Sequence, residues 1–333
     1  MNEKIDIVIT WVDGSDKEWL LEKNKYSKVK VDETNAVQRY RDFDQLKYWF
    51  RGIEKYAPWF NKIYFVTCGQ KPEWLNENNP KLVLVNHTDY IPHEFLPTFS
   101  SHPIELNFHR IENLSEKFIY FNDDMFLTDF VSPEDFFVNN KAVDNFVETT
   151  LVKVSDDYMF ANILLNTMGI INDKFNKRDV IKKNKNKLFS LNNSLKGNFK
   201  NLIYNKSMYF SLFEYDHLPS PLFKSTLNKV WSEYNDRLYS TCLNKFRSDY
   251  DVNQYVFKWW NLCEGNFVPK NYKFGKCFTL YDDNSELINS IKTNKYKFIC
   301  INDNNDFNDF ESVKTNVNNA FEVILSEKSS FEK

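Results

Sequence analysis

Apolar residues in the first 140 positions alternate between two spacings, one typical of buried strands and one typical of amphipathic helices. Short runs rich in β-branched and aromatic residues predict strands at 5–10, 62–67, 81–86 and 117–122. Between them, apolar positions recur every three or four residues at 41–60 and 100–114, which predicts helices. Because strands alternating with helices build a mostly parallel sheet, we predict an α/β fold with helices on both faces.

Local signals indicate where individual elements begin and end. Asp42 or Asp44 is available as the N-cap of the first helix, and Pro58 would stop it. Ser100 is the expected N-cap of the helix at 100–114. A short helix is also expected at the end of "CGQKPEWL" (68–75). Further along, the pattern predicts helices near 214–234 and 250–265 and a strand at 296–302.

The chain divides into three parts on this pattern. Residues 1–140 form the α/β part. Residues 141–210 are a basic helical insertion, and residues 211–333 complete the same domain.

The segment 173–206 within the insertion is strongly basic. Nine lysines and Arg178 stand against Asp173 and Asp179, a local balance of +8. Its apolar positions keep a helical spacing, at Leu188, Leu191, Leu195, Phe199 and Leu202. One interpretation is an amphipathic helix in peripheral contact with an anionic membrane. The other is that the stripe packs on the protein's own core and the lysines are simply solvated.

Composition narrows the class of protein. Hydrophobic residues make up 42% and aromatic residues 17% of the 333 positions, enough for a large core. The net charge of −3 gives no reason to expect a nucleic-acid partner. The five cysteines lack zinc-ribbon spacing and are odd in number, so reduced thiols in the cytoplasm are the simplest interpretation. No stretch is apolar enough to predict a membrane span.

Polar residues follow the predicted strands directly. Asp13 comes after the first, Gln70 after the second, and Asn122, Asp123 and Asp124 after the fourth. Ligands of parallel α/β sheets collect at the carboxyl ends of the strands. We therefore expect these side chains to line one rim of the sheet.

The chain resembles the Stealth family in several ordered stretches. They are "IDIVITWVDGSDKEW" (5–19), "RYRDFDQLKYWFRGIEKYAPWFNKIYFVTCGQKPEWL" (39–75), "LPTFSSHPIELNFHRIENLSEKFIYFNDDMFL" (96–127), "HLPSPLFKSTLNKVWSEY" (217–234) with "FRSDYD" (246–251), and "CINDN" (300–304). The first two family blocks cover most of 5–138, the third lies around 215–260 and the fourth at 298–310. The insertion lies outside the blocks.

This family contains the hexose-1-phosphate transferases of bacterial capsule synthesis and the catalytic subunit of the lysosomal N-acetylglucosamine-1-phosphotransferase. The resemblance implies a Rossmann-like sheet similar to that of nucleotide-sugar transferases (GT-A-like), with residues 1–140 as the nucleotide-sugar-binding part and residues 211–333 completing the catalytic domain. It also implies transfer of sugar-1-phosphate from a UDP-sugar donor to a hydroxyl of a glycan acceptor, lipid-linked or free, with release of UMP. Such an enzyme would work in the cytoplasm or peripherally on the inner face of the cell membrane.

Transfer at phosphorus needs charge neutralisation on the diphosphate and a base for the hydroxyl. Mg²⁺ or Mn²⁺ prefers hard carboxylate ligands, which Asp123 and Asp124 supply, with Asp303 in a similar rim position. Asx turns or loop caps are the structural alternative for these residues. His217 lies where the family's proposed base lies. Imidazole suits that role because it titrates near neutral pH. His109 is the competing histidine, although its helix position also suits a buried structural role.

The remaining candidates would bind the substrate. Arg247 and Arg39 could clamp phosphate oxygens bidentately, or could pair with Asp249 and Asp42. Arg110, beside His109, is a weaker candidate. For the nucleotide, the candidates in "WVDGSD" and "CGQ" are Trp11, Asp13, Gly14 and Gln70, with a simple strand-to-helix turn as the alternative.

Two rival functions remain open at this point. One is a metal-dependent glycosyltransferase that attacks the sugar carbon and releases UDP. The other, disfavoured because Asp123, Asp124, His217 and Arg247 occur together, is a carbohydrate-binding protein without catalysis.

Overall fold

The central sheet of the computed structural model has five strands in the order β10-β4-β1-β2-β3. The structure describes residues 3–27, 42–151, 158–303 and 307–333. Four strands are parallel, namely β1 (Ile5–Thr10), β2 (Ile63–Thr67), β3 (Leu82–Asn86) and β4 (Lys117–Phe121). The fifth, β10 (Ser220–Phe223), runs antiparallel to β4 at the edge. The α/β class with a mostly parallel sheet is thereby confirmed.

A smaller sheet continues from the carboxyl end of β4. After the turn at 122–124 the chain forms β5 (Met125–Leu127), which pairs with β13 (Phe298–Asn302) and through it with β12 (Gly275–Thr279). The other strands of the described residues form two small sheets. One has three strands in the order β11 (Phe267–Pro269), β7 (Lys141–Asp144) and β6 (Phe137–Val138), and the other pairs β8 (Glu148–Thr149) with β9 (Leu212–Phe213).

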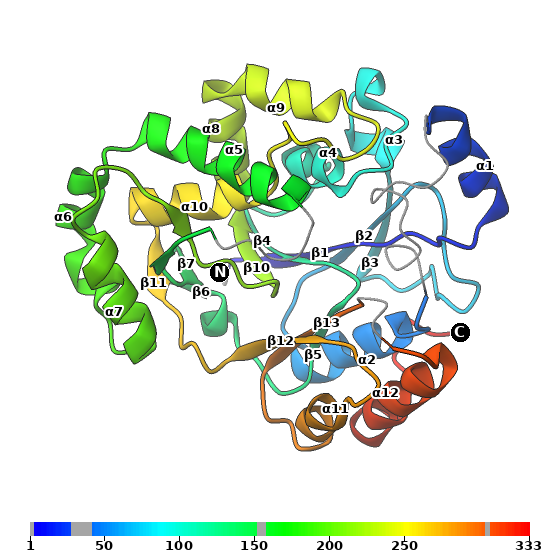
Figure 1. Cartoon of the computed structure of the whole chain (residues 1–333). Coiled ribbons are helices and arrows are strands. Elements are labelled where there is room, and N and C mark those ends of the chain that lie inside the picture. Colours follow the sequence, from blue (N-terminus) through cyan, green and yellow to red (C-terminus); the bar gives the residue numbers. More distant parts are fainter. Residues whose placement is uncertain (1–2, 28–41, 152–157, 304–306) are drawn as a thin grey trace.

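Helices cover both faces of the central sheet, as predicted. Successive strand residues point to opposite sides, so Ile7 packs in one hydrophobic core and Val8 in the other. The first core is closed by α2 (Leu46–Tyr56), α11 (Ser285–Lys292) and α12 (Phe310–Ile324). The second is closed by α4 (Ser101–Leu106), α5 (Tyr158–Lys174), α8 (Lys224–Glu233), α9 (Asn235–Cys242) and α10 (Tyr255–Glu264). Figure 1 shows the two groups of helices below and above the sheet.

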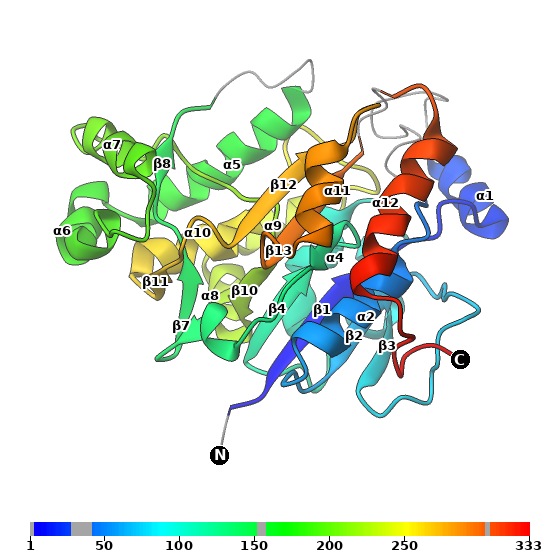
Figure 2. The same ribbon diagram turned by 90° about the horizontal axis from the view of Figure 1, so that it is seen from below.

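The remaining helices lie around the margins. They are α1 (Lys17–Tyr26), α3 (His87–Tyr90), α6 (Lys177–Leu188) and α7 (Leu195–Tyr204), with short 3₁₀ turns at His93–Phe95, Phe108–Arg110 and Pro133–Asp135. In both views α6 and α7 form one end of the molecule and α1 lies at the other (Figures 1 and 2).

Several local predictions were wrong. The N-cap of α2 is Gln45 rather than Asp42 or Asp44, because the Asp42 carboxylate accepts from the Asp44 amide (2.7 Å) in a turn before the helix. No helix forms at 71–75. The helix expected at 100–114 ends at Leu106, although Ser100 caps it as predicted.

The basic segment is not one helix. It contains the end of α5, all of α6, a connection at 189–194 and α7, whose Ser194 side chain caps the new start. Leu188 packs into the core whereas Leu191, Leu195, Phe199 and Leu202 are exposed. The strand β10 was also missed, since its "SPLF" stretch carries a proline, which is typical of edge strands.

Candidate active site

The carboxyl ends of β1, β2 and β4 meet at one edge of the sheet. Since β10 runs antiparallel to β4, with Ser220 opposite Tyr120, the residues just before β10 reach the same edge. This places His217 beside the turn that contains Asp123 and Asp124. We call Asp123, Asp124, His217 and Arg247 the carboxyl-edge site.

His217 and Asp124 form the centre of this site. The His217 Nε2 and Asp124 Oδ2 atoms lie 3.1 Å apart, and 38% and 29% of the two side chains are exposed. Burial lowers the pKa of His217, but the charge of Asp124 and its hydrogen bond outweigh this and raise it to about 9. While Asp124 carries an uncompensated charge, the imidazole therefore stays protonated at neutral pH.

Asn122 contacts the same imidazole nitrogen. Its Nδ2 lies 3.1 Å from His217 Nε2, and its Oδ1 lies against the Tyr120 hydroxyl, which is also 3.0 Å from Glu105 Oε1. The nitrogen can accept from Asn122 only when bare and can donate to Asp124 only when protonated. The two contacts thus provide partners for both protonation states, as a proton-accepting base requires.

Asp123 lies against a pocket of about 190 Å³ that Trp11 and Arg247 also line. Desolvation by the surrounding protein, followed by the charge of Asp124, raises the pKa of Asp123 to about 7. Its side chain still meets solvent within the pocket, so a cation or substrate can reach it.

Arg247 approaches the pocket from the segment after α9. Its Nη2 donates to Ser101 Oγ (3.2 Å), and within the described residues no carboxylate forms an ion pair with it. The alternative pairing with Asp249 is thus not formed. A guanidinium that lines a pocket without a carboxylate partner can bind an anionic group of a ligand.

Divalent metal binding can be tested on the donor atoms themselves. Asp124 Oδ1 is buried and, among the described residues, has no hydrogen-bond partner, as a ligand atom for a cation would. Asp124, His217 and Cys300 offer donor atoms within 4.8 Å of one another. Because Mg²⁺ and Mn²⁺ prefer oxygen, Asp123 and Asp124 fit best, and Asp303 follows β13, whose Ile301 amide donates to the Asp124 carbonyl (2.9 Å).

The loop after β1 is held by Gln70. The Gln70 side chain accepts from the Asp13 amide (2.8 Å) and donates to the Asp13 carbonyl (3.0 Å) and to Asp16 Oδ2 (3.1 Å). Asp13 Oδ1 accepts from the amide and hydroxyl of Ser15, which closes the turn that includes Gly14. Trp11 stacks on Phe65 with ring centroids 5.7 Å apart and forms one wall of the pocket.

Other candidates lie elsewhere. Arg39 falls outside the described residues. His109 is buried against Trp231, and burial lowers its pKa to about 3. Arg110 places its guanidinium over the same indole ring and donates to Asn107. His217 Nε2 lies 3.1 Å from Asp124 Oδ2 whereas His109 packs on Trp231, so the structure groups His217, and not His109, with the acidic turn.

Two cysteines near Asp124 could not be identified from the sequence. Cys300 donates its thiol to Asp124 Oδ2 (3.5 Å), and Cys277 is its register partner on β12. The hydrogen bond with Cys277, together with burial, raises the pKa of Cys300, which keeps it a thiol. Only the pairing of β13 with β5 brings Cys300 to Asp124, and no spacing along the chain shows that pairing.

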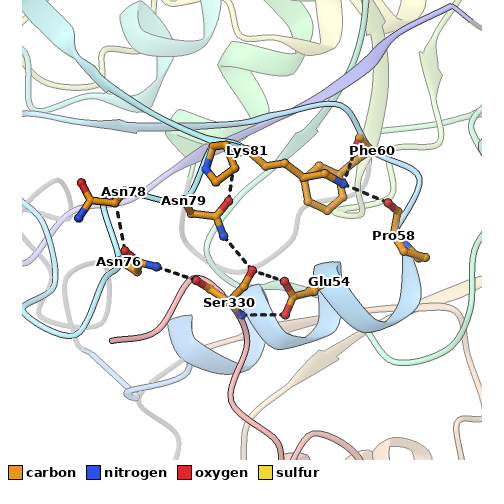
Figure 3. Close-up of a pocket in the computed structure, with 9 residues that line it drawn as sticks. Glu54, Pro58, Phe60, Asn76, Asn78, Asn79, Lys81 and Ser330 are labelled. Carbon is orange, nitrogen blue, oxygen red and sulfur yellow. Dashed lines mark hydrogen bonds between the residues drawn. The ribbon is translucent and has the colours of Figure 1, made fainter.

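A second pocket lies at the opposite, amino edge of the sheet (Figure 3). Its polar groups bond to one another: Asn76 Nδ2 donates to the Ser330 carbonyl, Asn79 Nδ2 to the Ser330 hydroxyl, and the Ser330 amide to Glu54. These bonds fasten the C-terminal segment, so the pocket has a structural explanation.

Together these groups place a histidine–carboxylate pair beside a pocket lined by an arginine that has no ion-pair partner among the described residues of this α/β fold. Comparison with known proteins narrows the class. The family models described as Stealth protein conserved regions 1 and 2 match residues 3–28 and 39–145. The chain is 41% identical to a capsular polysaccharide phosphotransferase, WcwK, of Streptococcus pneumoniae, across 99% of this chain and 98% of the relative.

It is also 40% identical to the receptor polysaccharide phosphotransferase WefC of Streptococcus gordonii, with 100% of both chains covered. The protein therefore belongs to the Stealth family, as its motifs predicted. Among solved structures, a mutant of LgtC aligns over 94% of this chain and 95% of its own at 10% identity, with a TM-score of 0.40. No functional conclusion depends on so distant a likeness.

Proposed function

We propose that the protein transfers sugar-1-phosphate from a UDP-sugar to a hydroxyl of a glycan acceptor and releases UMP, in the synthesis of a capsule or other cell-surface polysaccharide. The observation that carries the proposal is the His217–Asp124 pair beside the pocket that Arg247 lines. Full-length relatives named polysaccharide phosphotransferases support it.

In the proposed reaction the acceptor oxygen forms a bond to the phosphorus that carries the sugar, and the bond from that phosphorus to UMP breaks. The hydroxyl proton goes to His217 Nε2, where Asp124 accepts the resulting N–H. Arg247 neutralises phosphate oxygens, and the loop held by Gln70 positions the nucleotide against Trp11. The sugar C1–O bond stays intact throughout.

The base role requires that the charge of Asp124 be compensated, because that charge keeps His217 protonated. Mg²⁺ or Mn²⁺ held by Asp123, Asp124 and Asp303 would supply the compensation and would neutralise the diphosphate. In this proposal the enzyme works in the cytoplasm, and its acceptor is a glycan carried on a lipid at the inner face of the cell membrane.

Product analysis tests the proposal. A set of UDP-sugars is incubated with enzyme, acceptor and Mg²⁺ or Mn²⁺, and the nucleotide and glycan products are separated. We expect UMP and a phosphodiester-linked sugar that retains the anomeric configuration of the donor. UDP together with a phosphorus-free product would replace this proposal by the glycosyltransferase alternative.

A further inference from the structure

Exposed apolar side chains gather on and around α7. Leu191 and Leu195 are 96% and 90% exposed, and Phe199, Leu202, Ile203 and Met208 are each more than half exposed. We call these six residues the α7 face. Large exposed hydrophobic residues are common singly on protein surfaces, but a contiguous group marks an interaction site.

The helix α7 presents this face outward because its inward face is built from small and polar residues. Leu195, Phe199 and Leu202 share one side at helical spacing, while Gly197 and Asn201 are buried on the other. A Cβ at Gly197 would come within 3.1 Å of Val147. The helix α7 therefore exposes its apolar side and buries its small and polar side, the reverse of an ordinary surface helix.

Hydrogen bonds prevent α7 from turning its apolar side inward. Asn201 Nδ2 donates to the carbonyls of Phe146 and Leu188 (both 2.8 Å), and its Oδ1 accepts from the Glu148 amide (2.7 Å). Rotation of the helix would leave these buried groups without partners, at about 1–3 kcal/mol each. The exposed face is thus a fixed property of the fold.

The segment that carries the α7 face also carries exposed cations. Within the described residues, five exposed lysines of α6, α7 and the turn after α7 form no ion pair: Lys182, Lys183, Lys185, Lys196 and Lys206. Other lysines of this segment are engaged, since Lys177 pairs with buried Glu148 (2.7 Å) and Lys187 donates to the Gly265 carbonyl (2.6 Å). Figures 1 and 2 both place α6 and α7 at the same end of the molecule.

We propose that the α7 face docks on an anionic lipid bilayer, with its apolar side chains between the headgroups and the surrounding lysines on them. An apolar face on a segment that also carries exposed, unpaired lysines is complementary to such a surface, since long cationic side chains reach phosphate groups while apolar side chains enter the acyl boundary. No helix of the described residues is long and apolar enough to cross a membrane.

A second copy of the chain fits this surface poorly. In a two-fold contact the same patch meets itself, so the lysines of one protomer would face those of the other. Like charges in apposition oppose that association. The lysines that disfavour a dimer are those that favour an anionic surface.

Co-sedimentation with vesicles tests the docking directly and needs neither donor nor acceptor. The full chain is mixed at low salt with phosphatidylcholine vesicles that contain, or lack, phosphatidylglycerol. We expect binding to the anionic vesicles only. The test variant is the triple change Leu195→Gln, Phe199→Gln and Leu202→Gln, for which we expect at least a ten-fold weaker partition.

Matched control variants distinguish a specific effect of the α7 face from the general effect of removing exposed apolar or charged side chains. Leu21→Gln, Leu165→Gln and Val323→Gln remove exposed apolar side chains elsewhere and should leave binding unchanged. Changing Lys182, Lys183 and Lys196 to Gln should weaken binding by about 10², roughly five-fold per lysine. Changing Lys25, Lys292 and Lys328 to Gln should weaken vesicle binding far less.

Three results would overturn the proposal. The first is a wild-type chain that does not bind anionic vesicles, and the second is an α7 triple variant that binds them as well as wild type does. The third is a wild-type dimer in light scattering that the α7 variant dissociates, without vesicle binding by either. Transfer of sugar-1-phosphate to a soluble acceptor, followed by the release of UMP, is measured in parallel, and its absence in wild type would count against the proposed function instead.

Discussion

The acidic turn of the carboxyl-edge site and the lysines of the segment that carries the α7 face bear opposite charges in different surroundings. Asp123 and Asp124 follow β4 at the pocket, where Asp123 still meets solvent although desolvation raises its pKa to about 7. The lysines around α7 stand in solvent beside apolar side chains that nothing in the described structure covers. Charges concentrated in a small pocket suit a compact ligand such as a cation or a phosphate. Charges spread along an apolar face suit an extended partner. Substitutions in one region should therefore impair its own function, transfer or membrane binding, and leave the other unchanged.

The most damaging single change should be His217→Ala. The base would be lost, and we expect transfer to fall by about 10²–10⁴ while vesicle binding stays at the wild-type level. Steady-state UMP release measures the first effect and co-sedimentation the second. His93→Ala, at an exposed histidine outside the site, serves as the control. Near-normal transfer by the His217 variant would remove it from the mechanism.

A somewhat smaller loss is expected for Asp124→Asn, which keeps the shape of the side chain and removes its charge. Loss of one electrostatic partner in the transition state typically lowers the rate by about 10²–10³. Wild type should also lose activity in EDTA and regain it with Mg²⁺ or Mn²⁺. Asp236→Asn on exposed α9 should behave like wild type. Activity of the Asp123→Asn, Asp124→Asn double variant that is near normal and insensitive to EDTA would exclude metal assistance at these carboxylates.

The two regions also differ in how far the sequence predicted them. Alternating strand and helix patterns located β1 to β4, and the rule that ligands lie at carboxyl ends brought Asp13, Gln70 and Asp124 to one edge. The third family block suggested His217. The contact between His217 and Asp124, however, depends on β10, whose antiparallel pairing no local pattern revealed.

For the α7 face the sequence showed the helical spacing of the apolar residues but not which of them are buried. Helical spacing from Leu188 to Leu202 predicts one amphipathic helix, yet Ser194 starts a new helix and Leu188 alone of the stripe turns into the core. What decides the outcome is Asn201, whose three hydrogen bonds join segments far apart in sequence. Local propensity contains no information on such contacts.

The loss of folding stability at low pH should come from buried histidines outside the two charged regions. Burial lowers the pKa of His109 to about 3, below its unfolded value near 6.5, so the unfolded chain binds more protons as pH falls below 6.5. Stability is therefore fully present above that pH and declines on acidification, by about 2 kcal/mol at pH 5 for this group. His217 has the opposite sign, because its pKa is raised.

Chemical denaturation of wild type and His109→Gln at pH 7 and pH 5 checks this. The free energy of unfolding should fall less for the variant between these two values, while UMP release at pH 7 scales with the folded fraction. An unchanged pH dependence would mean that another group controls acid unfolding. A specific loss of turnover in fully folded His109→Gln would show that His109, and not only His217, acts in the reaction.

The smallest effect should come from Gln70→Ala. This change removes the hydrogen bonds to both backbone groups of Asp13 and to Asp16, so the loop that carries Trp11 should become less ordered without any loss of catalytic atoms. If Gln70 is a positioning residue, KM for the donor rises about five-fold, equivalent to about 1 kcal/mol, whereas kcat changes less than two-fold. Asn78→Ala, at the amino edge, should alter neither constant. An equal fall in kcat would instead place Gln70 among the groups that act only in the transition state, because uniform loss of binding affects KM alone.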